Sequence, residues 1–210
     1  MTAELWTAEP FVPDSRSLAA LARAAQSCTG CPLYIDTTQT VFGSGQRDAD
    51  IILVGEQPGD QEDRKGEPFV GPAGAVLWRC VEKAGLDRDR LYVTNAVKHF
   101  KHETRGKRRL HKKPTTLEAE ACHPWLDAEL RAVKARVVVA LGAVAARALV
   151  GKPVSVTRSA DEVFEIDGRQ LLVTYHPSAA LRAEEQAAEI RERIVADLRR
   201  AARIAGRPGR

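Results

Sequence analysis

Short apolar runs alternate with segments of helical spacing along this chain, and this alternation restricts its fold more than any other feature. Residues 49–56 (ADIILVGE), 91–97 (LYVTNAV) and 136–142 (RVVVALG) are such runs. Continuous apolar runs are typical of strands that are buried on both faces of a parallel sheet. Because helices separate the strands, we expect a three-layer αβα sandwich with a central, mainly parallel sheet, formed as one domain over residues 1–210.

The intervening segments predict the helical layers. Residues 15–28 and 143–151 have helical spacing, and a helix from about Pro72 ends at Gly85. Residues 115–118 (TTLE) form a capping box that opens a helix to about Lys134. Asp167-Gly168 marks a hairpin between the last two strands. The tail from Ser178 to Ile204 is expected to be one long amphipathic helix.

Composition limits the cellular setting. The chain has 210 residues, 44% of them hydrophobic, and no apolar run of the length, about 18 residues, that would cross a membrane. Its N-terminus lacks the basic and apolar regions of a secretory signal. We therefore expect a cytoplasmic monomer without membrane contact.

Positive charge is concentrated in one segment. The net charge is only +4, but residues 98–113 contain eight Lys or Arg and a single acid, Glu103. Within this segment, KRRLHKKP (107–114) places one histidine, His111, among five cations. Such a segment favours a polyanion, most simply a nucleic-acid backbone, or it is a solvated loop.

Four cysteines suggest a metal centre. Cys28 and Cys31 form a Cys-x-x-Cys pair, whereas Cys80 and Cys122 stand alone inside predicted helices. Disulfides are rare in a reducing cytosol. Four thiolates suit a [4Fe-4S] cluster, zinc more often uses two close pairs, and single cysteines are often small buried hydrophobes. Spacing alone leaves these three interpretations open.

Three loops are expected to share one edge of the sheet. They are GEQPGDQEDRKGEPFVGPAG after the first strand, NAVKHF with the basic segment after the second, and HPS after the last. In open parallel sheets the site lies in loops beyond the carboxyl ends of the strands.

These motifs, in this order, resemble the iron–sulfur uracil-DNA glycosylases. The resemblance rests on GEQPGDQED, GEPFVGPAG, VTNAVKHF and HPSAALR together with the cysteines, and it extends from about Cys28 to Arg182. Common members read GEAPG at the first motif and lack the KRRLH insertion. Gln57 and this insertion are similar to the UdgX-type subgroup, whose members become covalently joined to uracil-containing DNA.

The resemblance implies a pocket for a flipped-out uracil, because a glycosylase must take its base out of the stack. Phe69 would stack on the base and Asn95 would read its edge, while Gly55 allows a close approach. From the residues alone, Phe69 could equally be a core side chain, and Asn95 a turn former.

Cleavage of the glycosidic bond leaves a cationic sugar and a uracil anion, and both charges need stabilisation. His176 would donate a hydrogen bond to the anion, although a histidine at this position could simply cap the final helix. Glu56 would orient water or hold a histidine in the right tautomer, and Gln57 would position sugar, water or uracil.

In the UdgX-type subgroup the histidine of the inserted loop attacks the sugar, and here that histidine is His111. Glu56 would accept the other ring proton, and the neighbouring cations would keep the imidazole neutral. The phosphates of single- or double-stranded DNA would be bound by six cations: Lys107, Arg108, Arg109, Lys112, Lys113 and Arg182. Free uracil would be the product. Otherwise His111 is one more phosphate contact.

Three other functions remain open from the sequence. An ordinary turnover uracil-DNA glycosylase would share the fold, cluster and pocket, and would release a free abasic site. A non-catalytic nucleic-acid-binding module would show salt-sensitive binding without preference for uracil. A redox protein is disfavoured, because no motif indicates a dinucleotide site or a second redox partner.

Overall fold

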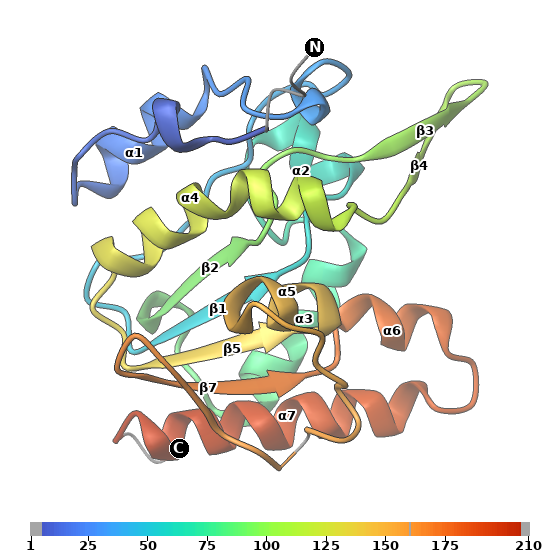
Figure 1. Ribbon diagram of the computed structural model, residues 1–210. Coiled ribbons are helices and arrows are strands. Elements are labelled where there is room, and N and C mark those ends of the chain that lie inside the picture. Colours follow the sequence, from blue (N-terminus) through green and yellow to red (C-terminus); the bar gives the residue numbers. More distant parts are fainter. Residues whose placement is uncertain (1–5, 160, 207–210) are drawn as a thin grey trace.

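The computed structural model describes residues 6–159 and 161–206, and it places a five-stranded sheet between two layers of helices (Figure 1). The strand order is β2-β1-β5-β7-β6, and all pairs are parallel except β6 with β7. The strands are β1 (Ile51–Gly55), β2 (Leu91–Asn95), β5 (Val137–Leu141), β6 (Phe164–Ile166) and β7 (Arg169–Thr174). The predicted fold class is confirmed, including the antiparallel pair around Asp167-Gly168.

The helices cover both faces of the sheet. They are α1 (Leu18–Ala25), α2 (Asp60–Lys65), α3 (Pro72–Ala84), α4 (Thr116–Ala132), α5 (Ala143–Val150), α6 (Pro177–Arg182) and α7 (Ala187–Ile204). Single 3-10 turns occupy Glu9–Phe11, Pro32–Tyr34 and Arg88–Arg90. One apolar core joins the sheet to α3, α6 and α7, and a second joins its other face to α4 and α5. A third core packs α1 and the N-terminal segment against the outer side of α4.

Local sequence explains several helix ends. Thr115 and Glu118 form the predicted capping box of α4, and Gly85 ends α3 with a left-handed φ of 75°. The prediction of one long C-terminal helix is wrong. Ala183 is extended, with ψ of 127°, and separates α6 from α7, which lets α7 fold back along α3. No Gly or Pro marks this break, so packing of α7 on the sheet decides it.

The basic segment was expected to be a loop, but it contains a β-hairpin. Strands β3 (His102–Arg105) and β4 (Arg108–His111) pair antiparallel around Gly106 and Lys107, and Gly106 has a φ of 58°. Figure 1 shows this hairpin projecting from the body on the side toward which the sheet strands point. His111, the last residue of β4, pairs with His102 at the end of the hairpin that joins the body of the protein, next to the predicted site.

Candidate active site

The loops after β1, β2 and β7 meet at the carboxyl edge of the sheet, as predicted. In the β1–β2 register Gly55 is paired with Asn95, and both residues are buried. β7 ends at Thr174, two residues before His176, and its neighbour β5 pairs Leu141 with Thr174. The sheet register therefore brings the predicted base-binding residues and His176 to one edge.

Phe69 and Asn95 converge over Gly55. A Cβ atom added at Gly55 would lie 2.7 Å from Phe69 Cζ and would overlap Asn95 Oδ1. Phe69 is 5% exposed and also contacts the core, so the pocket and core interpretations both hold for this side chain. Glycine at position 55 lets a flat apolar ring and an amide both approach the end of β1 closely, and these are the two kinds of group that a planar, hydrogen-bonding base requires.

The backbone of Phe69 is held in an unfavourable conformation. Its φ is 57°, which costs a residue with a Cβ about 1–2 kcal/mol. The indole N–H of Trp78 donates to the Phe69 carbonyl at 2.9 Å, and a Cβ at Gly74 would overlap that carbonyl. Arg88 lies 3.8 Å above the Trp78 ring. Trp78, which sequence reasoning missed, thus fixes the orientation of Phe69 from within α3.

His176 is held as a neutral donor. Its Nδ1 accepts the backbone N–H of Ser178 at 3.2 Å and lies 2.7 Å from Ser178 Oγ. Because Nδ1 accepts, the neutral ring carries its proton on Nε2. Burial, together with the charges of Arg182 and His111, lowers the pKa of His176 to about 4. The residue therefore caps α6 with one nitrogen and keeps the other free to donate, so both interpretations of it are compatible.

Glu56 and His111 face each other across the edge. Glu56 Oε1 lies 3.6 Å from His111 Nε2. Burial raises the pKa of the Glu56 carboxyl, against the opposing charges of Lys113 and Arg182. Burial also lowers the pKa of His111, and Arg182 adds to this effect. The imidazole is therefore neutral at pH 7, as expected, although burial and a cation from α6, rather than the neighbouring cations of the hairpin, are responsible.

The Gln57 side chain binds backbone groups where the hairpin joins the body of the protein, and it does not face the predicted uracil pocket. Its Nε2 donates to the carbonyl oxygens of Lys101 and Lys112 at 3.2 and 3.0 Å, and its Oε1 accepts the N–H of Lys101 at 3.1 Å. The side-chain amide is fully engaged with backbone on both sides of the hairpin. The expectation that Gln57 positions sugar, water or uracil is corrected: it positions the segment that carries His111.

Arg109 pairs with carboxylates of the protein itself and is not free to contact phosphate. Its guanidinium lies 2.6 Å from Asp60 Oδ1 and 2.6 Å from Asp63 Oδ2, and it stacks 5.5 Å from the centre of the Phe100 ring. The side chain is only 15% exposed. The prediction of a DNA-binding role is corrected, because two carboxylates of α2 already neutralise this arginine and tie β4 to α2.

We expect Arg109→Ala to loosen the hairpin and to remove every function that depends on His111, because Asp63 would be left buried without its cation. Arg108→Ala is the matched control, since Arg108 is the preceding residue of the same strand but is exposed. Amide hydrogen exchange over residues 101–113 measures the effect. Equal exchange rates in the two variants would contradict the conclusion that Arg109 ties β4 to α2.

A buried ion pair lies directly behind Asn95. Lys98 pairs with Glu129 of α4, and both side chains are 1% exposed. Lys98 Nζ also donates to the carbonyl oxygen of Asn95 at 2.7 Å. Glu129 further accepts hydrogen bonds from the hydroxyls of Tyr92 and Thr94, each at 2.9 Å. Lys98 was counted among the cations of a solvated or phosphate-binding segment, but it supports the backbone of the pocket.

The four cysteines do not come together. Cys28 and Cys122 share the third core, and Cys28 and Cys31 act electrostatically on Cys122. Cys80 lies in the first core on the opposite face of the sheet, where its Sγ contacts the Arg191 carbonyl at 3.8 Å. Within residues 6–159 and 161–206, no three His, Cys, Asp or Glu side chains are arranged to hold a metal ion. The sheet therefore separates Cys80 from Cys28 and Cys122, which the prediction of a four-cysteine ligand set did not anticipate.

A buried histidine lies near the other three cysteines. His99 follows Lys98, whose backbone N–H donates to Cys122 Sγ at 3.3 Å. His99 Nε2 lies 2.9 Å from Thr40 Oγ1, and this hydroxyl donates to the Ala25 carbonyl just before the Cys28 segment. Burial lowers the pKa of His99 to about 4. His99 and three of the cysteines thus lie on one side of the sheet, away from Cys80.

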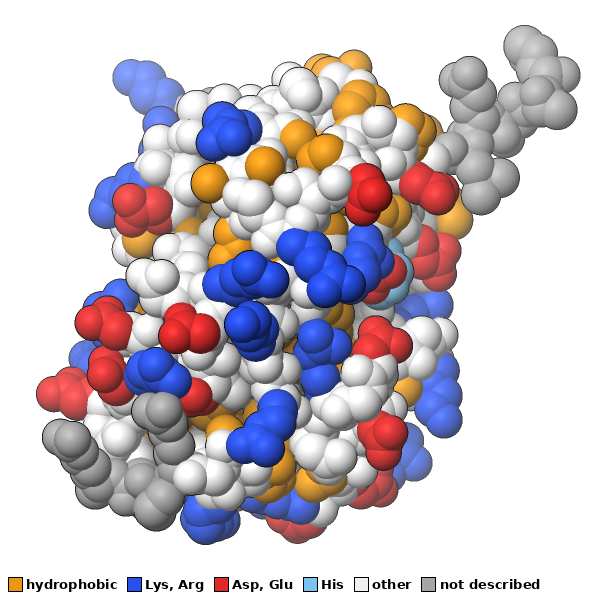
Figure 2. Space-filling model, turned by 90° about the vertical axis from the view of Figure 1, so that its left-hand side faces the viewer, with side chains coloured by type: hydrophobic (Ala, Val, Ile, Leu, Met, Phe, Trp, Pro, Cys, Tyr) orange, Lys and Arg blue, Asp and Glu red, His pale blue; other side chains and the backbone are white. Residues whose placement is uncertain are grey.

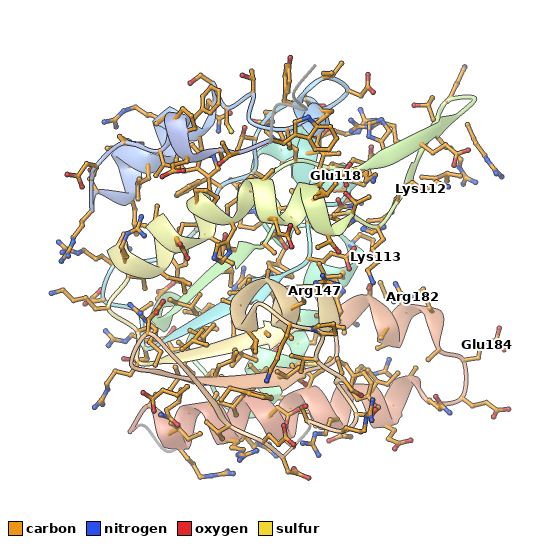
Figure 3. All side chains as sticks on the ribbon, in the orientation of Figure 1. Lys112, Lys113, Glu118, Arg147, Arg182 and Glu184 are labelled. Carbon is orange, nitrogen blue, oxygen red and sulfur yellow. The ribbon has the colours of Figure 1, made fainter. Side chains whose placement is uncertain are left out.

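The remaining predicted phosphate contacts are exposed on the hairpin side. Lys107, Arg108, Lys112, Lys113 and Arg182 are all exposed, and Lys112 pairs with Glu103 at 2.6 Å. Figure 3 shows Lys112, Lys113 and Arg182 on the side of the molecule where the strands end, with Arg147 of α5 near them. A phosphate backbone that crosses the pocket would meet these cations.

Basic side chains also gather on the opposite side of the molecule (Figure 2). At the amino ends of the strands, Arg90 pairs with Asp50, Arg136 donates to the Ala205 carbonyl, and Arg169 donates to the Leu130 carbonyl. These arginines are engaged with groups of the protein itself. Charge alone therefore does not single out one face of the molecule.

Comparison with known proteins places these residues in a family context. The family model of the uracil DNA glycosylase superfamily matches residues 42–199. A type-4 uracil-DNA glycosylase of Thermotoga maritima is 36% identical over 178 residues, which are 84% of this chain and 88% of the relative. One of Archaeoglobus fulgidus is 33% identical over 199 residues, 91% of this chain and 94% of the relative. A type-5 uracil-DNA glycosylase of Pyrobaculum aerophilum is 34% identical over 152 residues, 64% of this chain and 63% of the relative.

No helix within the described part of the chain is long and apolar enough to cross a membrane.

Proposed function

The chain belongs to the uracil-DNA glycosylase superfamily, and from this premise we propose that it excises uracil from DNA at the carboxyl edge of its sheet. The observation that carries the proposal is the convergence of Phe69 and Asn95 over Gly55. The named relatives are enzymes, so the non-catalytic binding module is set aside.

The proposed chemistry follows from which side chain lies beside the base and which lies beside the sugar. Uracil enters between Phe69 and Asn95, with His176 beside it. When the bond from C1′ to N1 breaks, its electron pair stays on uracil, and the Nε2–H of His176 stabilises the anion. Because the His176 pKa is about 4, the ring donates as a neutral imidazole over the whole physiological range. Glu56 faces the cationic sugar and stabilises it.

Two fates of the sugar are possible. The names of the relatives support ordinary turnover, in which Glu56 orients a water molecule that attacks C1′ and a free abasic site is released. The Glu56–His111 pair supports a second candidate. In that case one ring nitrogen of His111 bonds to C1′, the other passes its proton to Glu56, and protein and DNA remain covalently joined.

The positioning of His111 is the observation that favours the second candidate. Gln57 and Arg109 fix both ends of β4, and they hold the imidazole opposite a carboxylate. Release of a free abasic site requires no histidine at this position. A histidine fixed 3.6 Å from the carboxylate is suited to competing with water for the sugar.

A denaturing gel tests both candidates. The protein is mixed with a labelled oligonucleotide that contains one uracil, beside a thymine control and the variants His111→Ala and Glu56→Gln. A slow band that requires uracil and is absent with His111→Ala supports covalent capture. Alkali-labile cleavage without that band supports turnover. The absence of both products would refute uracil excision.

The pH dependence should follow Glu56 rather than a histidine. The carboxylate is the required form, and its pKa is raised, so activity should begin to fall at a higher pH than an ordinary glutamate would give. The pKa of His176 is lowered to about 4 and that of His111 lies below its ordinary value of 6.5, so any inflection from a histidine should lie below 6.5. Single-turnover rates from neutral to acidic pH measure this, and Glu56→Gln should remove the acid limb.

We further propose an iron–sulfur cluster, as the resemblance implies, bound by Cys28, Cys31, Cys122 and His99. Burial raises the pKa of the Cys122 thiol to about 12, so a thiolate at this position requires a bound cation. When bound, the cluster would join the N-terminal segment to α4 and stabilise the fold.

Iron content tests this ligand set. Cys80→Ala should retain the iron and the visible absorbance of the purified protein, because Cys80 lies across the sheet. Cys122→Ser should lose both, and His99→Ala should lower them. Loss of iron from Cys80→Ala to the same extent as from Cys122→Ser would contradict the assignment.

A further inference from the structure

A groove between α4 and α5 adjoins the site, and of the predicted site residues only Lys113 lines it. Its volume is about 370 Å³, within the range of small-molecule sites of roughly 300–1,000 Å³. The floor and walls are mainly apolar: Pro114, Ala119, Val144, Ala148, Pro153 and Val154. Lys113 and Arg147 are the cations that line it, and both are exposed.

The groove lies beside residues of the proposed site. Lys113 follows His111 by two residues, and its charge acts on Glu56. At the start of α5, a Cβ on Gly142 would lie 3.0 Å from the Cβ of His176, and Ala143 next to it lines the groove. A DNA strand with its uracil beside His176 and Glu56 would therefore pass close to the groove. Figure 3 shows Lys113 and Arg147 on this side of the molecule.

We propose that this groove holds the base of the nucleotide adjoining the uracil on the same strand, while Lys113 and Arg147 bind its phosphate. The inference rests on the proposed uracil excision and deepens it. An apolar slot accepts the faces of any base, and cations at the mouth complement a phosphate. Because a paired base cannot enter the slot, the groove assigns the enzyme a preference for single-stranded DNA.

Binding to short single-stranded oligonucleotides tests the proposal. The uracil sugar carries a 2′-fluorine that slows cleavage, and the base on its 5′ or its 3′ side is replaced by a spacer without a base. For the wild-type chain, removal of the base on one side should weaken binding by about three- to tenfold, and removal on the other side should not. Ala148→Phe, which fills the groove, should bind all these oligonucleotides equally.

Arg147→Ala gives an independent readout that a structural role would not move. It should reduce the slope of log affinity against log salt by about 0.7, the value for one phosphate contact on a single strand. Arg131→Ala, at the other end of α4 and also exposed, should leave the slope unchanged. If Ala148→Phe does not fold, as judged by circular dichroism, the salt slope of Arg147→Ala decides whether the groove assignment stands.

The outcomes distinguish a failure of the groove assignment from a failure of the proposed uracil excision, on which the groove assignment rests. Uracil release from an unmodified oligonucleotide is measured with the same preparation. Release without any effect of the neighbouring base, together with an unchanged salt slope for Arg147→Ala, overturns the groove assignment alone. Equal affinity for single strands and duplexes also overturns it. Absence of release overturns the proposed function, and the inference falls with it.

Discussion

Replacement of Gly55 by alanine should reduce uracil excision by at least about a hundredfold, the order that loss of one positioned donor costs in other active sites. The added methyl would overlap Asn95 Oδ1 and would lie 2.7 Å from Phe69 Cζ. Phe69 cannot easily retreat, because Trp78 and Gly74 fix its backbone. The methyl therefore occupies the space that the base needs. Single-turnover excision rates measure the loss.

The same variant should bind DNA almost as well as the wild-type chain. The exposed cations next to the hairpin and in α6 are not among the groups that the added methyl would meet, and they supply the salt-dependent part of affinity. Gly168→Ala is the comparison: Gly168, unlike Gly55, has a left-handed φ of 73°, but no atom lies within 4 Å of the added Cβ. Comparable excision by the two variants would show that Gly55 does not border the base pocket.

Lys98→Met should lower the free energy of unfolding by about 3–5 kcal/mol, because it leaves Glu129 as a buried charge without its cation. For a chain of this size each kcal/mol shifts the melting temperature by about 2–4 °C, so a drop of roughly 10 °C is expected. The Asn95 carbonyl also loses a donor, so the pocket should lose its geometry below the melting transition. Thermal unfolding followed by circular dichroism measures the first effect.

Lys112→Met provides the comparison within the same basic segment. Lys112 also pairs with a glutamate, Glu103, but the two side chains are 53% and 41% exposed. Exposed pairs of this kind contribute about 0–1 kcal/mol. A loss of stability as large as that of Lys98→Met would contradict the distinction between a buried support and a solvated cation.

Local pattern predicted most of the scaffold. The strands beginning at Ile51, Leu91 and Val137 are buried on both faces, so their apolar runs were readable without tertiary information. The capping box at Thr115 and the glycine at position 85 specify helix ends through contacts with near neighbours in the chain. The sheet edge that holds Glu56, Asn95 and His176 follows from parallel strand order, which the alternation of strands and helices implies.

Charge and thiol chemistry were less readable, because the sequence shows residue type but not environment. Lys98 and Arg109 looked like members of a solvated cationic run, yet each is neutralised by carboxylates from α4 or α2. The hairpin itself was missed, since HETR and RRLH carry charges on both faces and lack the alternation of a half-buried strand. Cys80 looked equivalent to Cys122, but the two cysteines lie on opposite faces of the sheet.

The sequence by itself determined the layers, the edge at which the site lies and the residue types that could bind and cleave a nucleoside, because these depend on periodicity and chain order. Only the tertiary structure decided which of those polar residues are engaged with other parts of the protein and which are not. Gln57, Arg109 and Lys98 turned out to be supports. Whether a polar side chain is free to meet a ligand depends on which partners other elements bring to it, and those partners are distant in the chain.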